Sequence, residues 1–313
     1  MKVGPVKDLP GHPPMLSAPQ PPPSPFSGAK RAGRLAARCA PKKRGGGGGR
    51  VAGVPELAEV EAYRRLTEGV VGRRVGQVVT PDAWYLKRGL TAAAVRRALR
   101  GRTITGTRRL GKLLLVDTDG GPVLGLRFGM SGKLVIDGKA GIDDYAFASN
   151  RAVPAWDRFT LRFEGGGDLR MRDSRRLGGV ELDPDEARLG PDALTVGLAA
   201  LRVALAGSQA PLKARLMDQS RLAGVGNLAA DELLWRAALD PVRPASSLSP
   251  AELRRLHRHL GSTLADLLTR GGSHTGELMA ERRPGGVCPR DGESLRRATV
   301  GGRTTWWCPR HQT

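Results

Sequence analysis

The sequence predicts a multidomain α+β protein in which a β-rich region precedes a helical region and a short metal-binding hairpin. Strand-like runs separated by glycine turns dominate residues 55 to about 184. Leucines at helical spacing prevail over residues 190–272. Two cysteines in the tail, residues 285–313, are each followed three positions later by another metal-ligand side chain. These three observations define the predicted domains.

Residues 1–54 have the composition of a disordered leader. They contain ten of the 23 prolines, five consecutive glycines, and ten Lys or Arg against one Asp. They show no sustained apolar periodicity. Such a segment cannot bury enough apolar surface to offset the entropy lost on ordering. We therefore predict that it is disordered, and a mis-assigned start site would also explain it.

Two helices and a series of strands are expected in the β-rich region. Pro55 suits the first turn of a helix, and acidic residues follow it there. A second helix fits residues 91–100, with Thr91 as its N-cap and Gly101 at its end. Glycine turns at 119–121 and 165–167 suit hairpins. The expected strands cover residues 102–107, 113–118, 123–127, 133–137, 158–163 and 168–172.

The helical region contains one strong start signal. Ser249 and Glu252 form a capping-box pattern, and Pro250 occupies the first helical position between them. Leucines then recur on one face to about residue 267. Further helices are expected around Leu212 and Leu228.

The charge of the chain favours a polyanionic partner. The formal net charge is +21, of which the residues after the leader carry +12. A field of this sign and size is typical of proteins that bind nucleic acid. The sequence has no apolar run long enough to span a membrane and no secretory signal, which predicts a cytoplasmic protein without a membrane partner.

The tail has the spacing of a structural zinc site. Cys288 and Asp291 form one pair with two residues between them, and Cys308 and His311 form another. Short spacers of this kind let one turn direct two ligands at a single Zn²⁺ ion. Because Asp291 supplies oxygen where sulfur is usual, a metal-free hairpin with two buried cysteines remains the alternative.

Three further patterns indicate contacts with phosphate or with bases, although each is weak alone. The glycines before Asn227 would let backbone amides approach an anion at a helix start. Arg303 lies in the tail hairpin, where it could hold a phosphate, or could be an ordinary solvated arginine. Met130 and Leu177 lie in turns, where an apolar side chain can replace an extruded base, or could belong to the core.

Taken together, the motifs resemble the formamidopyrimidine-DNA glycosylase/endonuclease VIII family over essentially residues 55–313. The matching patterns occur in the family's order: P-E-L-x-E-V-E at 55–61, G-K at 111–112, G-M-S-G at 129–132, D-x-R-R-x-G at 173–178, L-x-D-Q-x-x-x-x-G-x-G-N at 216–227, and G-G-R-T-T…C-P at 301–309. The resemblance implies a two-layered β-sandwich with flanking helices, a helix–two-turn–helix domain and a C-terminal zinc-finger β-hairpin.

The resemblance also implies a base-excision repair enzyme that acts on damaged double-stranded DNA, as a monomer. Such an enzyme removes oxidised bases and then cleaves the abasic strand by β/δ-elimination. Pro55 matches the nucleophile, whose secondary amine forms a Schiff base with the sugar. Glu56 matches the general acid/base, and Lys112 the lysine that contacts phosphate and assists the departing base.

Five residues match the family's DNA contacts. The resemblance implies that Met130 fills the void left by the extruded base and that Arg175 faces the orphaned partner base. Asn227 and Arg303 match the pair that holds the phosphate beside the lesion. Leu177 stands where a phenylalanine wedge is common, which should weaken stacking but keep apolar filling.

Other departures concern the opening motif, the metal site and the substrate. Ala58 replaces the second proline of the opening motif, and Asp291 and His311 replace two zinc cysteines. The stretch from Gly271 to Cys288 leaves little room for a loop that caps oxidised purines. This shifts the expectation from 8-oxoguanine towards oxidised pyrimidines, and the preferred lesion and opposite base stay open.

Two other functions compete with this interpretation. A catalytically inactive damaged-DNA-binding protein of the same fold would not need the Pro55, Glu56 and Lys112 set. An RNA-binding protein sharing the helical domain is disfavoured by the β-rich region.

The leader conflicts with the proposed chemistry of Pro55. When Val54 precedes it, the Pro55 nitrogen is a tertiary amide that cannot form an iminium ion. A free α-amino group, by contrast, is substantially unprotonated near neutral pH. We therefore expect the native polypeptide to begin at Pro55, since Val54 is what a GTG start codon would specify if it were read as internal.

Overall fold

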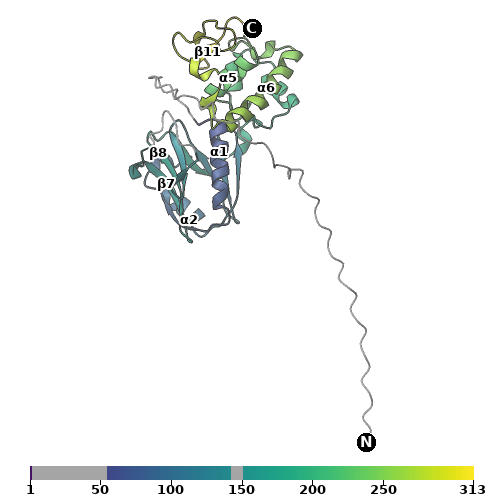
Figure 1. The fold of residues 1–313 in the computed structure, drawn as a ribbon. Coiled ribbons are helices and arrows are strands. Elements are labelled where there is room, and N and C mark those ends of the chain that lie inside the picture. The colour runs from purple at the N-terminus through teal and green to yellow at the C-terminus, as the bar shows by residue number, and fades with distance from the viewer. Residues whose placement is uncertain (2–54, 142–150) are drawn as a thin grey trace. The chain divides into compact units, whose positions relative to one another are not determined.

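The computed structural model describes Met1 and residues 55–141 and 151–313 (Figure 1). The predicted disorder of residues 1–54 therefore lies outside the described residues. The folded residues described here belong to one compact unit within Gly49–Thr313.

Two antiparallel sheets form the β-rich region, which confirms the predicted sandwich. Both sheets contribute buried side chains to one apolar core, for example Val116 and Leu126 from one sheet and Leu134 and Phe159 from the other. One sheet has the order β1 (Val75–Val79), β7 (Asp157–Phe163), β8 (Asp168–Asp173), β5 (Gly132–Ile136) and β6 (Lys139–Ala140). The other has the order β2 (Ile104–Leu110), β3 (Leu113–Thr118), β4 (Leu124–Arg127) and β9 (Gly179–Leu182).

Most strand predictions are confirmed to within a few residues, whereas β1, β6 and β9 were not predicted. The glycine turns at 119–121 and 165–167 connect β3 to β4 and β7 to β8, as expected. β1 contains an irregularity between Val75 and Gln77, which interrupts the alternation of side chains that would mark a strand. β9 has only four residues, too few to show a pattern.

Helix α1 (Leu57–Thr67) joins the sandwich to the helical region. Its Val60 and Tyr63 pack in the sandwich core, whereas Leu57 and Ala58 belong to the helical core. Pro55 precedes the helix rather than lying in its first turn, because Glu56 is the N-cap. Helix α2 (Ala92–Leu99) begins as predicted, with the Thr91 hydroxyl accepting a hydrogen bond from the Ala94 N–H.

The helical region contains four α-helices among the described residues: α3 (Leu198–Leu205), α4 (Leu212–Leu216), α5 (Asn227–Arg236) and α6 (Pro250–Thr269). The predicted capping box of Ser249 and Glu252 starts α6. Strands β10 (Arg296–Val300) and β11 (Arg303–Trp307) form the tail hairpin. Short 3-10 turns occur at η1 (Glu68–Val70), η2 (Ala83–Tyr85), η3 (Pro154–Trp156), η4 (Glu186–Arg188), η5 (Ala245–Ser247), η6 (Ser273–Thr275) and η7 (Met279–Glu281).

A third, small core attaches the tail to α5. Leu228 and Trp235 of α5 pack with Leu278, Cys288 and Cys308. Across the described ranges, no helix has the length and apolar character that crossing a membrane requires.

A buried ion network links α1, β2 and the loop that leads into the helical region. Arg109 contacts Glu61 at 3.1 Å and Asp192 at 3.0 Å, and only 5% of its side chain is exposed. Asp192 also accepts a 2.7 Å hydrogen bond from the Gly111 N–H. The network therefore holds the turn before Lys112 in place.

We expect Arg109→Met to lower the free energy of unfolding by about 3 kcal/mol, because it removes the cation that pairs with the partly buried Asp192 and one of the cations that pair with Glu61. Urea denaturation measures the change. Arg74→Met is the matched control, since Arg74 pairs with Glu164 at an exposed site and its loss should cost below about 1 kcal/mol. Equal losses in the two variants would contradict a structural role for the buried network.

Candidate active site

A cavity of about 360 Å³ brings together four of the predicted site residues. Pro55, Lys112, Met130 and Leu177 all line it, although they come from different parts of the chain. Its other lining residues are Leu113, Arg127, Phe128, Gly129, Leu189 and Gln219. Basic and apolar groups thus face one space beside the buried residue Pro55.

The carboxylate of Glu56 is bound by the N-terminus of helix α5. Its two oxygens accept hydrogen bonds from the Leu228 N–H at 2.9 Å and from the Ala229 N–H at 3.0 Å. The first backbone N–H groups of a helix have no partner within the helix, and the two Glu56 oxygens satisfy two of them here. The sequence predicted an anion site at this helix start, next to Asn227. In the structure the Glu56 carboxylate of the same chain occupies that site.

Gly226 makes this close approach possible. A Cβ atom at this position would lie 2.1 Å from the Glu56 carboxyl carbon. A side chain here would therefore displace the carboxylate, which explains one glycine of the G-V-G-N pattern.

Glu59 is a second buried carboxyl group next to Glu56. It accepts hydrogen bonds from the Glu56 N–H at 3.0 Å and from the Ser273 hydroxyl at 2.9 Å. Burial, together with the nearby Glu56 carboxylate, raises the pKa of Glu59 to about 7. Glu59 is part of the opening motif, but the sequence alone indicated no role for it. Its partner Ser273 is far away in the chain, so no local sequence pattern could predict their contact.

Lys112 lies at the tight turn between β2 and β3. Gly111 there has a φ of +58°, and a Cβ atom would lie 2.7 Å from the Ala223 Cβ. Burial lowers the pKa of Lys112, the carboxylates of Glu56 and Glu59 oppose this shift, and Arg303 adds to it. A lysine with a lowered pKa gives up its proton more readily than an exposed one.

The loops that carry Met130 and Leu177 are braced by Asp173. This buried carboxylate accepts hydrogen bonds from the Ser131 hydroxyl and from the N–H groups of Arg176 at 3.1 Å and Gly178 at 2.8 Å. Leu177 is consequently presented to solvent with 48% of its surface exposed. Asp173, the first residue of the D-x-R-R-x-G motif, therefore fixes the conformation of the loop that the motif forms.

A buried ion pair connects α4, α5 and the tail hairpin. The Lys213 ammonium lies 2.7 Å from an Asp231 carboxylate oxygen, and both side chains are 0% exposed. It also donates to the Asn227 side-chain oxygen at 2.7 Å and to the Thr305 hydroxyl at 2.8 Å. Asp231 further pairs with Arg282 at 2.8 Å. No motif identified Lys213 as a site residue.

This network fixes how Asn227 is oriented. Because the Asn227 side-chain oxygen accepts a hydrogen bond from Lys213, the side-chain N–H groups of Asn227 are available to bind a ligand.

The other two predicted DNA contacts, like Asn227, do not line the cavity. Arg303 is exposed at the start of β11, two residues before Thr305. Arg175 is exposed as well. These three predicted DNA contacts lie outside the lining of the cavity.

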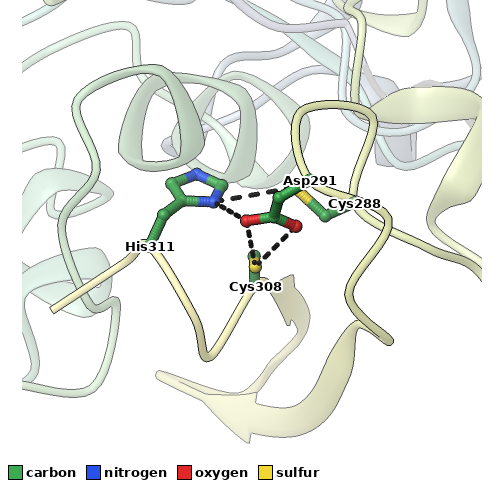
Figure 2. Close-up of side chains that lie close together, drawn as sticks. All are labelled: Cys288, Asp291, Cys308 and His311. Carbon is green, nitrogen blue, oxygen red and sulfur yellow. Dashed lines mark hydrogen bonds and ion pairs between the residues drawn. The ribbon is translucent and has the colours of Figure 1, made fainter.

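The four predicted metal ligands converge at the tail (Figure 2). The ligand atoms of Cys288, Asp291, Cys308 and His311 all lie within 4.8 Å of one another. The Cys288 sulfur is 3.6 Å from the His311 Nδ1, which lies 3.1 Å from an Asp291 oxygen. Ligands around a tetrahedral Zn²⁺ ion lie roughly 3.3–3.8 Å apart, so the spacing fits such an ion.

Neighbouring groups orient these ligands. The His311 Nε2 lies 3.3 Å from the Trp235 carbonyl oxygen, to which it can donate, leaving Nδ1 for a metal. The Trp235 indole N–H and the Arg290 N–H both donate to the Cys288 sulfur. The cluster can therefore hold a metal ion.

Comparison with known proteins gives consistent matches over both main regions. Residues 54–180 match the formamidopyrimidine-DNA glycosylase N-terminal domain, and residues 189–278 match the formamidopyrimidine-DNA glycosylase H2TH domain. The formamidopyrimidine-DNA glycosylase of Xanthomonas campestris is 34% identical over 82% of this chain and 98% of its own length. That of Methylococcus capsulatus is 34% identical over 83% of this chain and its entire length.

Solved structures agree. The Lactococcus lactis Fpg in complex with DNA containing an abasic site has a TM-score of 0.69 and 26% identity, covering 82% of this chain and 99% of that chain. The same protein bound to Fapy-dG-containing DNA has a TM-score of 0.70 and 27% identity, covering 82% and 100%.

The sandwich, the helix–two-turn–helix region and the tail hairpin define a DNA glycosylase of base-excision repair. The chain belongs to the formamidopyrimidine-DNA glycosylase family, whose members are bifunctional glycosylases and abasic-site lyases. The catalytically inactive alternative is disfavoured accordingly.

We expect Lys213→Met to weaken binding to an uncleavable abasic-site duplex about ten-fold, because Asn227 and the hairpin lose their shared anchor. Fluorescence anisotropy measures the affinity, and thermal melting checks folding. Arg202→Met removes the same charge from an exposed position on α3 and is the matched control. If both variants lose the same affinity, net charge and not positioning explains the effect.

Proposed function

We propose that Pro55, Glu56 and Lys112 carry out base removal and strand cleavage in this protein. The observation that carries the proposal is the placement of Pro55 and Lys112 in one cavity, with the Glu56 carboxylate held beside them by α5. A protein that only bound DNA would have no use for this combination of nucleophile, acid/base and half-buried amine.

The free Pro55 nitrogen attacks the sugar C1′ of the damaged nucleotide. The C1′–N bond to the base breaks, and the base leaves with that electron pair and is protonated. Opening of the sugar ring then gives an iminium ion between Pro55 and C1′. This cation accepts the electrons released when a proton leaves C2′, so that the C3′–oxygen bond breaks in β-elimination. In δ-elimination a proton then leaves C4′, and the released electrons break the C5′–oxygen bond, whose electron pair departs with the phosphate.

Glu56 moves protons on the opened sugar, and Lys112 contacts phosphate and assists the departing base. The two hydrogen bonds from α5 keep Glu56 in one orientation during these transfers. Burial lowers the pKa of Lys112, which makes its proton easier to release than that of an exposed lysine.

The remaining site residues hold the DNA. Met130 and Leu177 fill the space left by the extruded nucleotide, and Arg175 faces the orphaned base. Asn227 and Arg303 hold the phosphate beside the lesion. Support for this assignment comes from the Asp173 and Lys213 networks, which fix the loops and the hairpin that present these residues.

The partner is double-stranded damaged DNA, bound by one copy of the chain in the cytoplasm with the chromosomal DNA. The relatives are named for formamidopyrimidine lesions, whereas the short stretch from Gly271 to Cys288 favours oxidised pyrimidines. The rates at which one enzyme preparation cleaves duplexes that each carry a single lesion of either class distinguish the two substrate preferences.

The metal held by Cys288, Asp291, Cys308 and His311 is zinc in this proposal. When bound, it supplies a structural cross-link between the two ends of the tail hairpin. The neighbouring Trp235 and its contacts then connect the hairpin to α5.

The catalytic form begins at Pro55. The chemistry requires a free amine there, and an amide bond to Val54 removes it. The N-terminal domain match starts at residue 54, and the relatives cover their own lengths almost fully while matching 82–83% of this chain, which supports the proposal.

We expect Glu56→Gln in the form that starts at Pro55 to lose base-excision turnover by 100-fold or more, since the amide cannot transfer the proton. Single-turnover cleavage of a lesion duplex measures it. Binding to an uncleavable abasic-site duplex should persist, because the amide oxygen still accepts one bond from α5. Glu68→Gln, at an exposed position, is the control. Near-normal turnover would assign proton transfer to another group.

Borohydride trapping on abasic DNA should give a covalent adduct only with the form that starts at Pro55. The reason is that only this form has a secondary amine at the site. The full 313-residue chain and a form with one extra alanine before Pro55 are the controls. A robust adduct from the full chain with Met1 intact would contradict the assignment of Pro55 and indicate an internal lysine.

Cys308→Ser should reduce bound zinc from about one ion per chain and weaken DNA binding, because the hairpin has little other core. Elemental analysis and anisotropy measure the two effects. Thr299→Ser, at an exposed position on β10, is the control. Wild-type protein without zinc would refute the ligand assignment.

A further inference from the structure

Trp84 is an exposed aromatic side chain that the catalytic proposal does not use. Its relative exposure is 68%. In the described part of the chain, the other large exposed hydrophobic side chains are aliphatic: Met1, Val71, Leu177, Val203, Val242 and Val287. An exposed indole costs solvation free energy, so its position relative to the site is informative.

The segment that carries Trp84 is fixed to the Leu177 loop. Asp82 accepts a hydrogen bond from the Trp84 N–H at 3.1 Å and forms an ion pair with Arg176 at 2.7 Å. On the other side of Trp84, the Lys87 N–H donates to the Val180 carbonyl at 2.8 Å. The two segments therefore form one surface, on which Trp84 lies beside the loop of Arg175 and Leu177.

The surroundings of Trp84 are basic. The Lys87 ammonium lies 5.4 Å from the centre of the Trp84 ring and donates to the Trp84 carbonyl at 2.9 Å. Arg175 and Arg176 are exposed on the adjoining loop. An aromatic ring among cations is the combination that binds nucleic acid by stacking, and it does not suit an apolar protein partner.

We propose that Trp84 stacks on a nucleotide of the strand opposite the lesion and supplies the aromatic contact that Leu177 lacks. The inference rests on the proposed function, in which Arg175 faces the orphaned base of that strand and Leu177 fills the gap beside it. A leucine can fill the gap in the duplex but offers no π-face to the exposed bases. Trp84 lies on the same rigid surface and offers one.

Photo-cross-linking tests the strand and the residue together. The full wild-type chain is bound to an uncleavable abasic-site duplex with 5-iodouracil in one strand near the lesion, and each strand is labelled in turn. We expect the cross-link at Trp84 from the opposite strand. A cross-link at Trp84 from the lesion strand, or none at Trp84 from either, overturns the proposal.

Affinity provides a second measurement. Trp84→Ala should weaken binding to the same duplex about ten-fold, whereas Trp84→Phe should retain most of the affinity. Val203→Ala, which truncates an exposed side chain on α3, should leave binding unchanged. Equal affinities of Trp84→Ala and wild type overturn the proposal. Because the cross-link uses unmodified protein, it decides the question even if a variant folds poorly.

The outcome is distinguishable from failure of the catalytic proposal. Borohydride trapping by the form that starts at Pro55 reports on the chemistry alone. An adduct without any Trp84 contact overturns only the stacking inference. A Trp84 contact without an adduct supports stacking and overturns the lyase assignment.

Discussion

The hydrogen bonds between the Glu56 carboxylate and the first turn of α5 are the interaction on which the site depends. They join residues that are 172 and 173 positions apart in the chain. Through them, the segment that carries Pro55, the proposed nucleophile, is attached to the helix that carries Asn227. Helix α1 begins directly after this attachment and contributes side chains to both large cores. The proposed nucleophile and the proposed phosphate contact are thus held together by one rigid attachment.

Two further buried charges complete this frame. Arg109 fixes the Lys112 turn from the sandwich side, and Asp173 fixes the loops of Met130 and Leu177. Each of these groups makes several hydrogen bonds, so that its charge is compensated without solvent. The site is consequently built on rigid supports, while the proposed DNA contacts are half-buried or exposed.

Local patterns in the sequence predicted the elements that are locally determined. Ser249 and Glu252 predict the start of α6, because a capping box involves only four consecutive residues. Thr91 predicts the start of α2, because its N-cap hydrogen bond is equally local. The clustering of Cys288, Asp291, Cys308 and His311 was also predictable, since the spacing within each pair is fixed by a single turn. β1 and β9 gave no such signal, because an irregularity interrupts one and the other is too short. The partners of Glu56, Glu59 and Lys213 come from distant segments, and only the folded chain brings them together.

The buried group of Lys213, Asp231 and Arg282 also restricts how this protein can diverge. The Lys213 side chain is fully buried and the Arg282 side chain is only 7% exposed, so the loss of Asp231 leaves two positive charges without the carboxylate that pairs with both. A single substitution at any of the three positions is therefore penalised even where a concerted replacement by apolar residues would be tolerated. The three positions are expected to be inherited together or exchanged together across related chains, and the hairpin that they secure is tied to the helical region for as long as they persist.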